Sequence, residues 1–191
     1  MYPDRAAPDI ARFIRISEKR HVSVSGDHYI IDLHIDGESL PTTSPEMRHE
    51  RSVAVCDLLK ENRFHPLKSL SGPYIVSLSL EDGARMIFDL KRSNGADRGC
   101  ISMSLKPFRR IIKDYFLICE SYHNAIRTAT SARIEAMDMG RRGLHNEGSG
   151  LLTDSLRHSV KMDFNTSRRM FTLICALHRG QRVIESGGNV M

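Results

Sequence analysis

The chain of 191 residues is 40% hydrophobic and 27% charged, with a formal net charge of +5. These values exclude the disordered and fibrous classes, and a chain of this length can fold as one domain without disulfides or a structural metal. Residues 1–20 lack the apolar core of a signal peptide, and no apolar run approaches the roughly 18 residues of a membrane span, so we expect a cytoplasmic protein without membrane association.

Four cysteines bear on the compartment and on metal binding. They form no CxxC pair and no Cys/His cluster with the spacing of a zinc site, and they stand at positions 56, 100, 119 and 175. We therefore expect free thiols in a reducing compartment, with no disulfide framework, no metal and no other cofactor.

The first part of the chain divides into an extension and the start of a domain. Residues 1–26 show no regular period, which is typical of a flexible or loosely docked N-terminal extension. Hydrophobic and polar residues then alternate over 29–35, which predicts a half-buried strand. Ser44 is a good N-cap and Pro45 suits a first helical position, so together they predict a helix over 45–62.

The middle of the chain predicts an antiparallel meander. Alternating stretches at 74–80, 84–90 and 100–105 each have one apolar face, as strands do when they cover a core on one side only. Asp82 and Gly83, between the first two stretches, are a strong signal for a hairpin turn. We expect these strands to form a small sheet with the earlier one.

Three further helices are predicted in the C-terminal half. Apolar residues recur at helical spacing over 107–127, 132–157 and 166–179. A short strand is expected at about 160–164, between the last two helices.

Together these elements predict an α+β fold. We expect a single domain over 27–179, in which a small antiparallel sheet of three to five strands is packed on one face by about four helices. A flexible C-terminal tail is expected over 180–191.

One polar segment, Asp138–Gly150, stands apart from the rest of the chain. It contains four glycines, although a glycine inside a helix costs about 1 kcal/mol relative to alanine, which suggests special backbone angles or a close contact. As a helix, the segment would place a guanidinium, an imidazole and a hydroxyl on one stripe suited to a phosphate or carboxylate. As a loop before a helix, it would offer free N–H groups to an anion. The candidate binding residues are Arg141, Arg142, His145, Asn146, Glu147 and Ser149.

A purely structural role explains the same segment. Gly140 can end one helix and Asn146 can cap the next. The two arginines can pair with Asp138 and Glu147, and the glycines can let two helices pack closely. The sequence leaves both interpretations open.

Arginine doublets recur at 109–110, 141–142 and 168–169, each at or near a predicted helix start. Three doublets on one face would suit a nucleic-acid partner. However, the chain has no tryptophan and is 6% aromatic, so no stacking platform for single strands is visible. Solvated or salt-bridged arginines explain the doublets as well.

No catalytic signature is complete in this chain. It lacks the GxGxxG, Walker A, HExxH and GxSxG motifs. His145, Asn146 and Glu147 include acid–base groups, but three adjacent side chains rarely converge on one point. The pattern favours a protein that is not an enzyme.

Several long motifs resemble a known family, the bacterial uncharacterised protein family 0262. The matching stretches are His49–Val55, Asp57–Asn62, Leu105–Tyr122, Arg133–Ser149 and Asp163–Cys175. The resemblance covers about 27–178, and it implies a bacterial cytoplasmic protein with no assigned activity and no known site residues.

Three functional hypotheses follow. The leading one is a non-enzymatic interaction or regulatory module in which the segment from Arg141 to Ser149 contacts a protein or a small anion. The second is an RNA- or ribosome-associated protein that uses the arginine doublets. The third is an enzyme acting on a phosphorylated or carboxylated metabolite. The sequence leaves the oligomeric state open, a homo-oligomer included.

Overall fold

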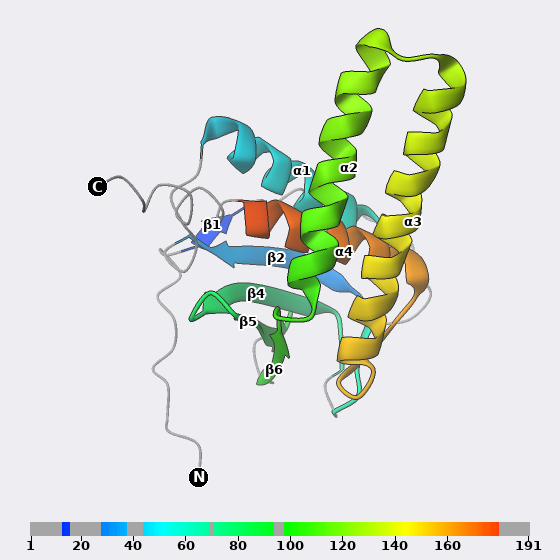
Figure 1. The fold of residues 1–191 in the computed structure, drawn as a ribbon. Coiled ribbons are helices and arrows are strands. Elements are labelled where there is room, and N and C mark those ends of the chain that lie inside the picture. The colour runs from blue at the N-terminus through cyan, green and yellow to red at the C-terminus, as the bar shows by residue number, and fades with distance from the viewer. Residues whose placement is uncertain (1–12, 16–27, 38–43, 69–70, 94–97, 180–191) are drawn as a thin grey trace.

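The computed structural model describes residues 13–15, 28–37, 44–68, 71–93 and 98–179 (Figure 1). The predicted α+β class is confirmed, and all four helices occur within a few residues of their expected bounds. They are α1 (Pro45–Lys60), α2 (Phe108–Thr128), α3 (Ser131–Leu156) and α4 (Phe164–Arg179). None of the helices in these residues combines the length and apolar character that crossing a membrane requires.

The main sheet has five strands in the order β1-β2-β4-β5-β6. A separate two-stranded sheet pairs the short strands β3 and β7. The bounds are β1 (Phe13–Arg15), β2 (Ile30–Asp36), β3 (Phe64–Pro66), β4 (Tyr74–Glu81), β5 (Arg85–Arg92), β6 (Arg98–Ser104) and β7 (Val160–Met162).

The main sheet is mixed, so the prediction of a purely antiparallel sheet is wrong at one pair. Strands β2 and β4 run parallel, while the other neighbours in the sheet are antiparallel. The chain leaves β2, passes through α1 and returns to the sheet at β4. A connection of this length allows a parallel return, whereas a tight turn does not. Alternation within a strand reports which face is buried but not the direction of its neighbour.

The hairpin between β4 and β5 follows the sequence prediction. Asp82 and Gly83 both have positive φ angles, 52° and 61°. Asp and Gly accept this left-handed backbone more readily than most other residues do. The apolar row of β4 points into the core, where Tyr74 and Val76 are fully buried.

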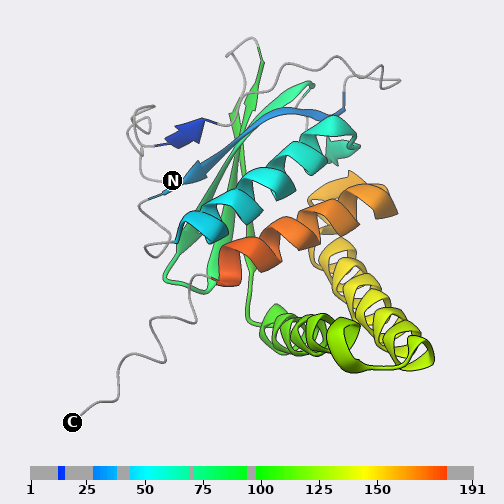
Figure 2. The ribbon, with the colours of Figure 1, turned by 90° about the horizontal axis from the view of Figure 1, so that it is seen from above.

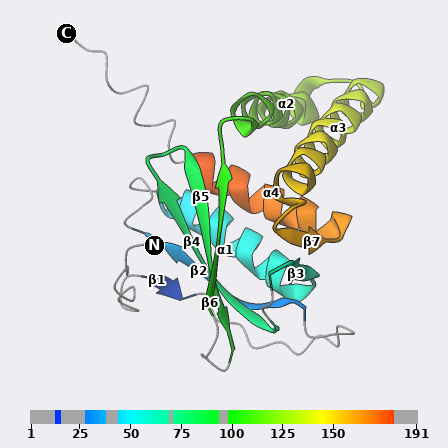
Figure 3. The ribbon, with the colours of Figure 1, turned by 90° about the horizontal axis from the view of Figure 1, so that it is seen from below.

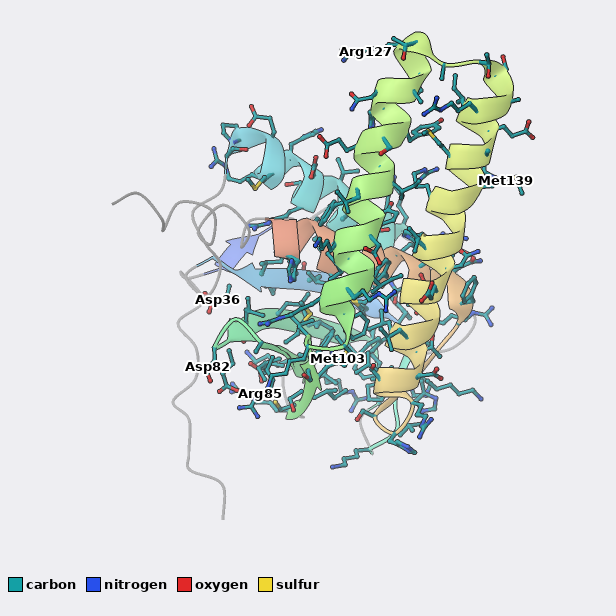
Figure 4. All side chains as sticks on the ribbon, viewed as in Figure 1. Asp36, Asp82, Arg85, Met103, Arg127 and Met139 are labelled. Carbon is teal, nitrogen blue, oxygen red and sulfur yellow. The ribbon has the colours of Figure 1, made fainter. Side chains whose placement is uncertain are left out.

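Helices α1 and α4 lie side by side across one face of the sheet (Figures 2 and 3). Helix α1 begins as the sequence predicts, because the Ser44 hydroxyl accepts the N–H of Met47 at 3.3 Å. Helices α2 and α3 form an antiparallel hairpin that joins the core at one end and projects from it at the other (Figure 1). Arg127 and Met139, labelled in Figure 4, lie on the projecting half.

The predicted termini fall largely outside the described residues. In the expected extension at 1–26, only 13–15 are described, and they form β1, antiparallel to β2. The expected tail at 180–191 lies outside them altogether. The division into extension, domain and tail therefore stays a prediction. The four cysteines are free thiols.

Candidate functional site

The polar segment Asp138–Gly150 is helical throughout and lies inside α3. Of the two backbone conformations that the sequence allowed, the helix is therefore the one present. Gly148 is buried against α4, where an added Cβ would overlap the ring of Phe171. An added Cβ at Gly143 or Gly150 would meet nothing within 4 Å. One of these glycines thus allows close helix packing, and two have no such packing role.

His145 lies one turn before Gly148 and is 7% exposed. Its ring packs at 5.4 Å from the rings of Tyr115 and Phe171. The hydroxyl of Thr172 donates to the backbone carbonyl of Arg168 at 3.1 Å, so its oxygen is left to accept from Nε2 of His145 at 2.9 Å. The hydrogen-bond pattern therefore places the ring proton on Nε2.

The two titratable rings of this cluster are held neutral. Burial, together with the positive charges of Arg168 and Arg141, lowers the pKa of His145 to about 4. Burial, together with the nearby thiol of Cys119, raises the pKa of Tyr115 to about 12. Near neutral pH, both rings therefore keep one protonation state.

Two arginines of α3 share one carboxylate. Arg141 donates from Nε and Nη2 to Oδ1 of Asp138, at 3.1 and 2.7 Å, and Nη2 of Arg142 lies 2.7 Å from Oδ2 of the same residue. The guanidinium of Arg141 also lies over the ring of Tyr122, 5.5 Å from its centroid. The hydrogen bond from Arg141 holds the pKa of Asp138 below its usual range, so the carboxylate is ionised.

Two arginines of α4 have hydrogen-bond partners of different charge. Arg169 donates from Nη1 to the backbone carbonyl of Glu61 at 2.6 Å and from Nη2 to its carboxylate at 2.9 Å. Arg168 donates from Nη1 to the side-chain carbonyl of Asn146 at 2.7 Å. Arg169 is therefore paired with a charge, whereas Arg168 is held by a neutral amide.

These side chains enclose a pocket of about 510 Å³ between α2, α3 and α4. It is lined by Tyr115, Arg141, Arg142, His145, Arg168, Arg169 and Thr172. Two of the three arginine doublets thus converge. The third does not, and its Arg110 has a 94% exposed side chain near Asp114, 3.7 Å away on α2.

The structure distributes the six predicted site residues over different surroundings. Arg141, Arg142 and His145 line the pocket, and Asn146 contacts it through Arg168. Glu147 is exposed and is not part of the lining. Ser149 is completely buried, and its hydroxyl donates to the backbone carbonyl of His145 at 2.7 Å, away from the pocket.

The pocket also contains residues that sequence reasoning did not include in the site. Tyr115 belongs to the apolar residues at helical spacing over 107–127, and Thr172 carries no signal of its own. Arg168 and Arg169 do carry one, since they form one of the three doublets. The sequence does not show, however, which two doublets lie on neighbouring helices.

Comparison with known proteins gives consistent matches over most of the chain. The model of the Uncharacterised protein family (UPF0262) matches residues 27–180. The chain is 50% identical to a UPF0262 protein of Rhizobium etli over 154 residues, which cover 81% of this chain and 97% of that relative. It is 51% identical to one of Brucella anthropi over 150 residues, covering 78% and 92%. A UPF0262 protein of Agrobacterium fabrum is 50% identical over 154 residues, covering 81% and 97%. No solved structure matches the chain.

Proposed function

This chain belongs to the uncharacterised protein family UPF0262, and we propose that it is a non-enzymatic binding module whose pocket between α2, α3 and α4 takes a small anion. The observation that carries this proposal is the gathering of four guanidinium groups around one concavity. Guanidinium groups are the side chains best suited to bind carboxylate or phosphate through paired hydrogen bonds.

The charge balance of the pocket supports an anionic occupant. Within the described part of the chain, two carboxylates contact the four arginines, those of Asp138 and Glu61. His145 is neutral and adds no charge. Two positive charges are therefore left in excess, and an anion would relieve their mutual repulsion.

The size of the pocket supports a small molecule. Its volume of about 510 Å³ lies inside the range of roughly 300–1,000 Å³ that small-molecule sites usually have. The two neutral rings of Tyr115 and His145 offer a partly apolar wall next to the guanidinium groups.

The protonation states of the pocket favour binding over catalysis. A general acid or base works best when its pKa lies near the working pH. The pKa of His145 is about 4 and that of Tyr115 about 12, so neither ring exchanges a proton readily near pH 7. We therefore assign these rings to the shape of the site and the arginines to its ligand.

A thermal-shift screen tests this function. The wild type is heated with a panel of small phosphorylated and carboxylated compounds, and Arg142→Gln is tested alongside. Arg110→Gln is the matched control, because it removes the same charge from an exposed helical position outside the pocket. We expect some of these anions to raise the melting temperature of the wild type and of Arg110→Gln, but much less that of Arg142→Gln.

Two results would contradict the proposal. Equal shifts in all three proteins would mean that the anions act elsewhere or only as salt. Tight binding of an RNA oligonucleotide that weakens steeply with salt, with no small-molecule shift, would favour the RNA-associated alternative.

The free thiols are in keeping with the cytoplasm as the predicted compartment.

A further inference from the structure

Arg168 differs from the other three arginines of the pocket in its partner. Arg141 and Arg142 share the carboxylate of Asp138, and Arg169 pairs with Glu61. Arg168 donates to Asn146, whose amide is neutral. The contact holds the guanidinium in place but leaves its charge uncompensated.

Arg168 and Arg141 line the pocket together with His145. Arg168 reaches from α4 to Asn146 on α3, next to His145. Arg168 and Arg141 both lie close enough to His145 to lower its pKa. Guanidinium groups from α3 and α4 therefore line the same pocket as this ring.

We propose that the pocket takes a phosphate monoester in its dianionic form, with Arg168 as its principal contact and Asn146 as the residue that positions Arg168. This inference rests on the proposed anion-binding function and deepens it. A phosphate monoester carries a charge of about −1.5 to −2 at pH 7 on three terminal oxygens. A single such group matches the two excess positive charges and can accept from several guanidinium groups at once.

A lone carboxylate fits the pocket less well. Its single charge would leave one of the excess positive charges unbalanced. A dicarboxylate has two charges, but it places them on separate groups, whereas a phosphate monoester presents both charges and three oxygens on one group to the arginines of the pocket. The organic part of the ester would occupy the rest of the pocket, beside Tyr115.

Asn146→Asp tests the role of Arg168 without removing any arginine. The exposed side chain keeps its size and its acceptor for Arg168, but it gains a negative charge. Asn124→Asp is the matched control, because it adds the same charge at an exposed position in a separate groove with Arg133 and Met137.

The probes are phenyl phosphate, phenyl sulfate and succinate, titrated by calorimetry into the three full-length proteins. Phenyl sulfate has nearly the shape of phenyl phosphate but only one charge, and succinate has two separated charges. We expect phenyl phosphate to bind the wild type about tenfold or more tightly than either of the others. We expect Asn146→Asp to weaken its binding by about tenfold or more and Asn124→Asp to leave it unchanged.

The pH dependence of binding gives a second measurement. The rings of His145 and Tyr115 do not titrate between pH 5 and 8, since their pKa values are about 4 and about 12. Asp138 also keeps its charge, since the hydrogen bond from Arg141 holds its pKa below the usual range. Binding of phenyl phosphate should therefore strengthen through its second ionisation, at about pH 6, while binding of phenyl sulfate should stay flat.

The outcomes separate this inference from the function on which it rests. Equal affinities for phenyl phosphate and phenyl sulfate, or for phenyl phosphate and succinate, would overturn the phosphate inference and leave an anion-binding pocket. Absence of binding by all three probes would overturn both. Full affinity in Asn146→Asp would remove Arg168 from its assigned role. Tighter binding of a phosphotyrosine peptide than of phenyl phosphate would identify the ligand as a phosphorylated protein. Weaker binding of the peptide would identify the ligand as a small molecule.

Discussion

Both halves of the α2–α3 hairpin carry large apolar side chains, but these have different surroundings. In the half that joins the core, Phe108 and Ile112 are completely buried. In the projecting half, Ile126, near the end of α2, is 52% exposed and Met139 (Figure 4) is 68% exposed. Phe108 and Ile112 belong to the main hydrophobic core, and α4 packs against α3 in the half near that core. The pocket lies on that half too, because it needs side chains from all three helices.

Two glycines of α3 that are close in sequence also differ in their surroundings, because they lie on different faces of the helix. Gly148 lies against Phe171 of α4, where no Cβ fits. Gly143, less than two turns earlier, faces open space. A residue type that looks uniform in the sequence therefore has opposite energetic consequences in the two surroundings.

The largest effect that distinguishes the two halves is expected from Ile112→Ala. Its side chain is completely buried, so its truncation should lower the free energy of unfolding by about 2–5 kcal/mol. Ile126→Ala on the projecting half of the same helix is the matched control, because that side chain is 52% exposed, and it should change the free energy of unfolding by about 0.5 kcal/mol or less. Urea unfolding measures both, and similar losses in the two variants would contradict the division of the hairpin.

Gly148→Ala should have the next largest effect. The new methyl group would overlap the ring of Phe171 and push α3 away from α4. Overpacking of this kind costs about 1–3 kcal/mol. The free energy of unfolding, measured in urea, should fall accordingly.

Gly143→Ala is the control for this substitution and should act in the opposite direction. The position is helical and open, so alanine should stabilise the protein by up to about 1 kcal/mol. A loss of stability at Gly143, or a gain at Gly148, would show that the two positions do not differ as described.

The pH dependence of the free energy of unfolding tests the burial of His145. Its folded-state pKa of about 4 lies below the ordinary value of 6.5. Between these values the unfolded chain binds a proton at this position and the folded chain does not. The contribution of His145 is therefore intact above pH 6.5 and is lost as the pH falls toward 4, by at most about 1.4 kcal/mol per pH unit.

Urea unfolding at pH 5 and pH 7.5 measures this effect in the wild type and in His145→Gln. The wild type should lose more stability between the two pH values than the variant does, because glutamine does not titrate. His123 is exposed on the projecting half, so His123→Gln should keep the wild-type difference. The same pH dependence in all three proteins would contradict a neutral, buried His145.

The smallest effect on stability is expected from Arg142→Gln. The Arg142 side chain is 68% exposed, although it contacts Asp138. An exposed ion pair contributes little, so the free energy of unfolding should change by about 0.5 kcal/mol or less. Binding of phenyl phosphate should nevertheless weaken. A loss of several kcal/mol would instead assign Arg142 to the structure of the hairpin.

The sequence by itself determined the secondary structure closely, because that structure depends on local periods and end signals. The Ser44 cap, the Asp82–Gly83 turn and the apolar row of α2 each act over a few residues. The family was also visible in contiguous motifs. The polar segment around His145 is visible in the sequence as well, because its residues are contiguous.

Only the tertiary structure decided where the side chains of that segment lie. Whether Ser149 faces a pocket or the core depends on where α4 lies, and the residues that bring α4 there are distant in sequence. Helix packing, which no local pattern encodes, brings Arg168 and Arg141 into one pocket. The parallel pairing of β4 with β2 also depends on contacts between elements rather than on a local pattern. A sequence reports the period of each element, but the contacts between elements depend on how all their apolar faces are buried together.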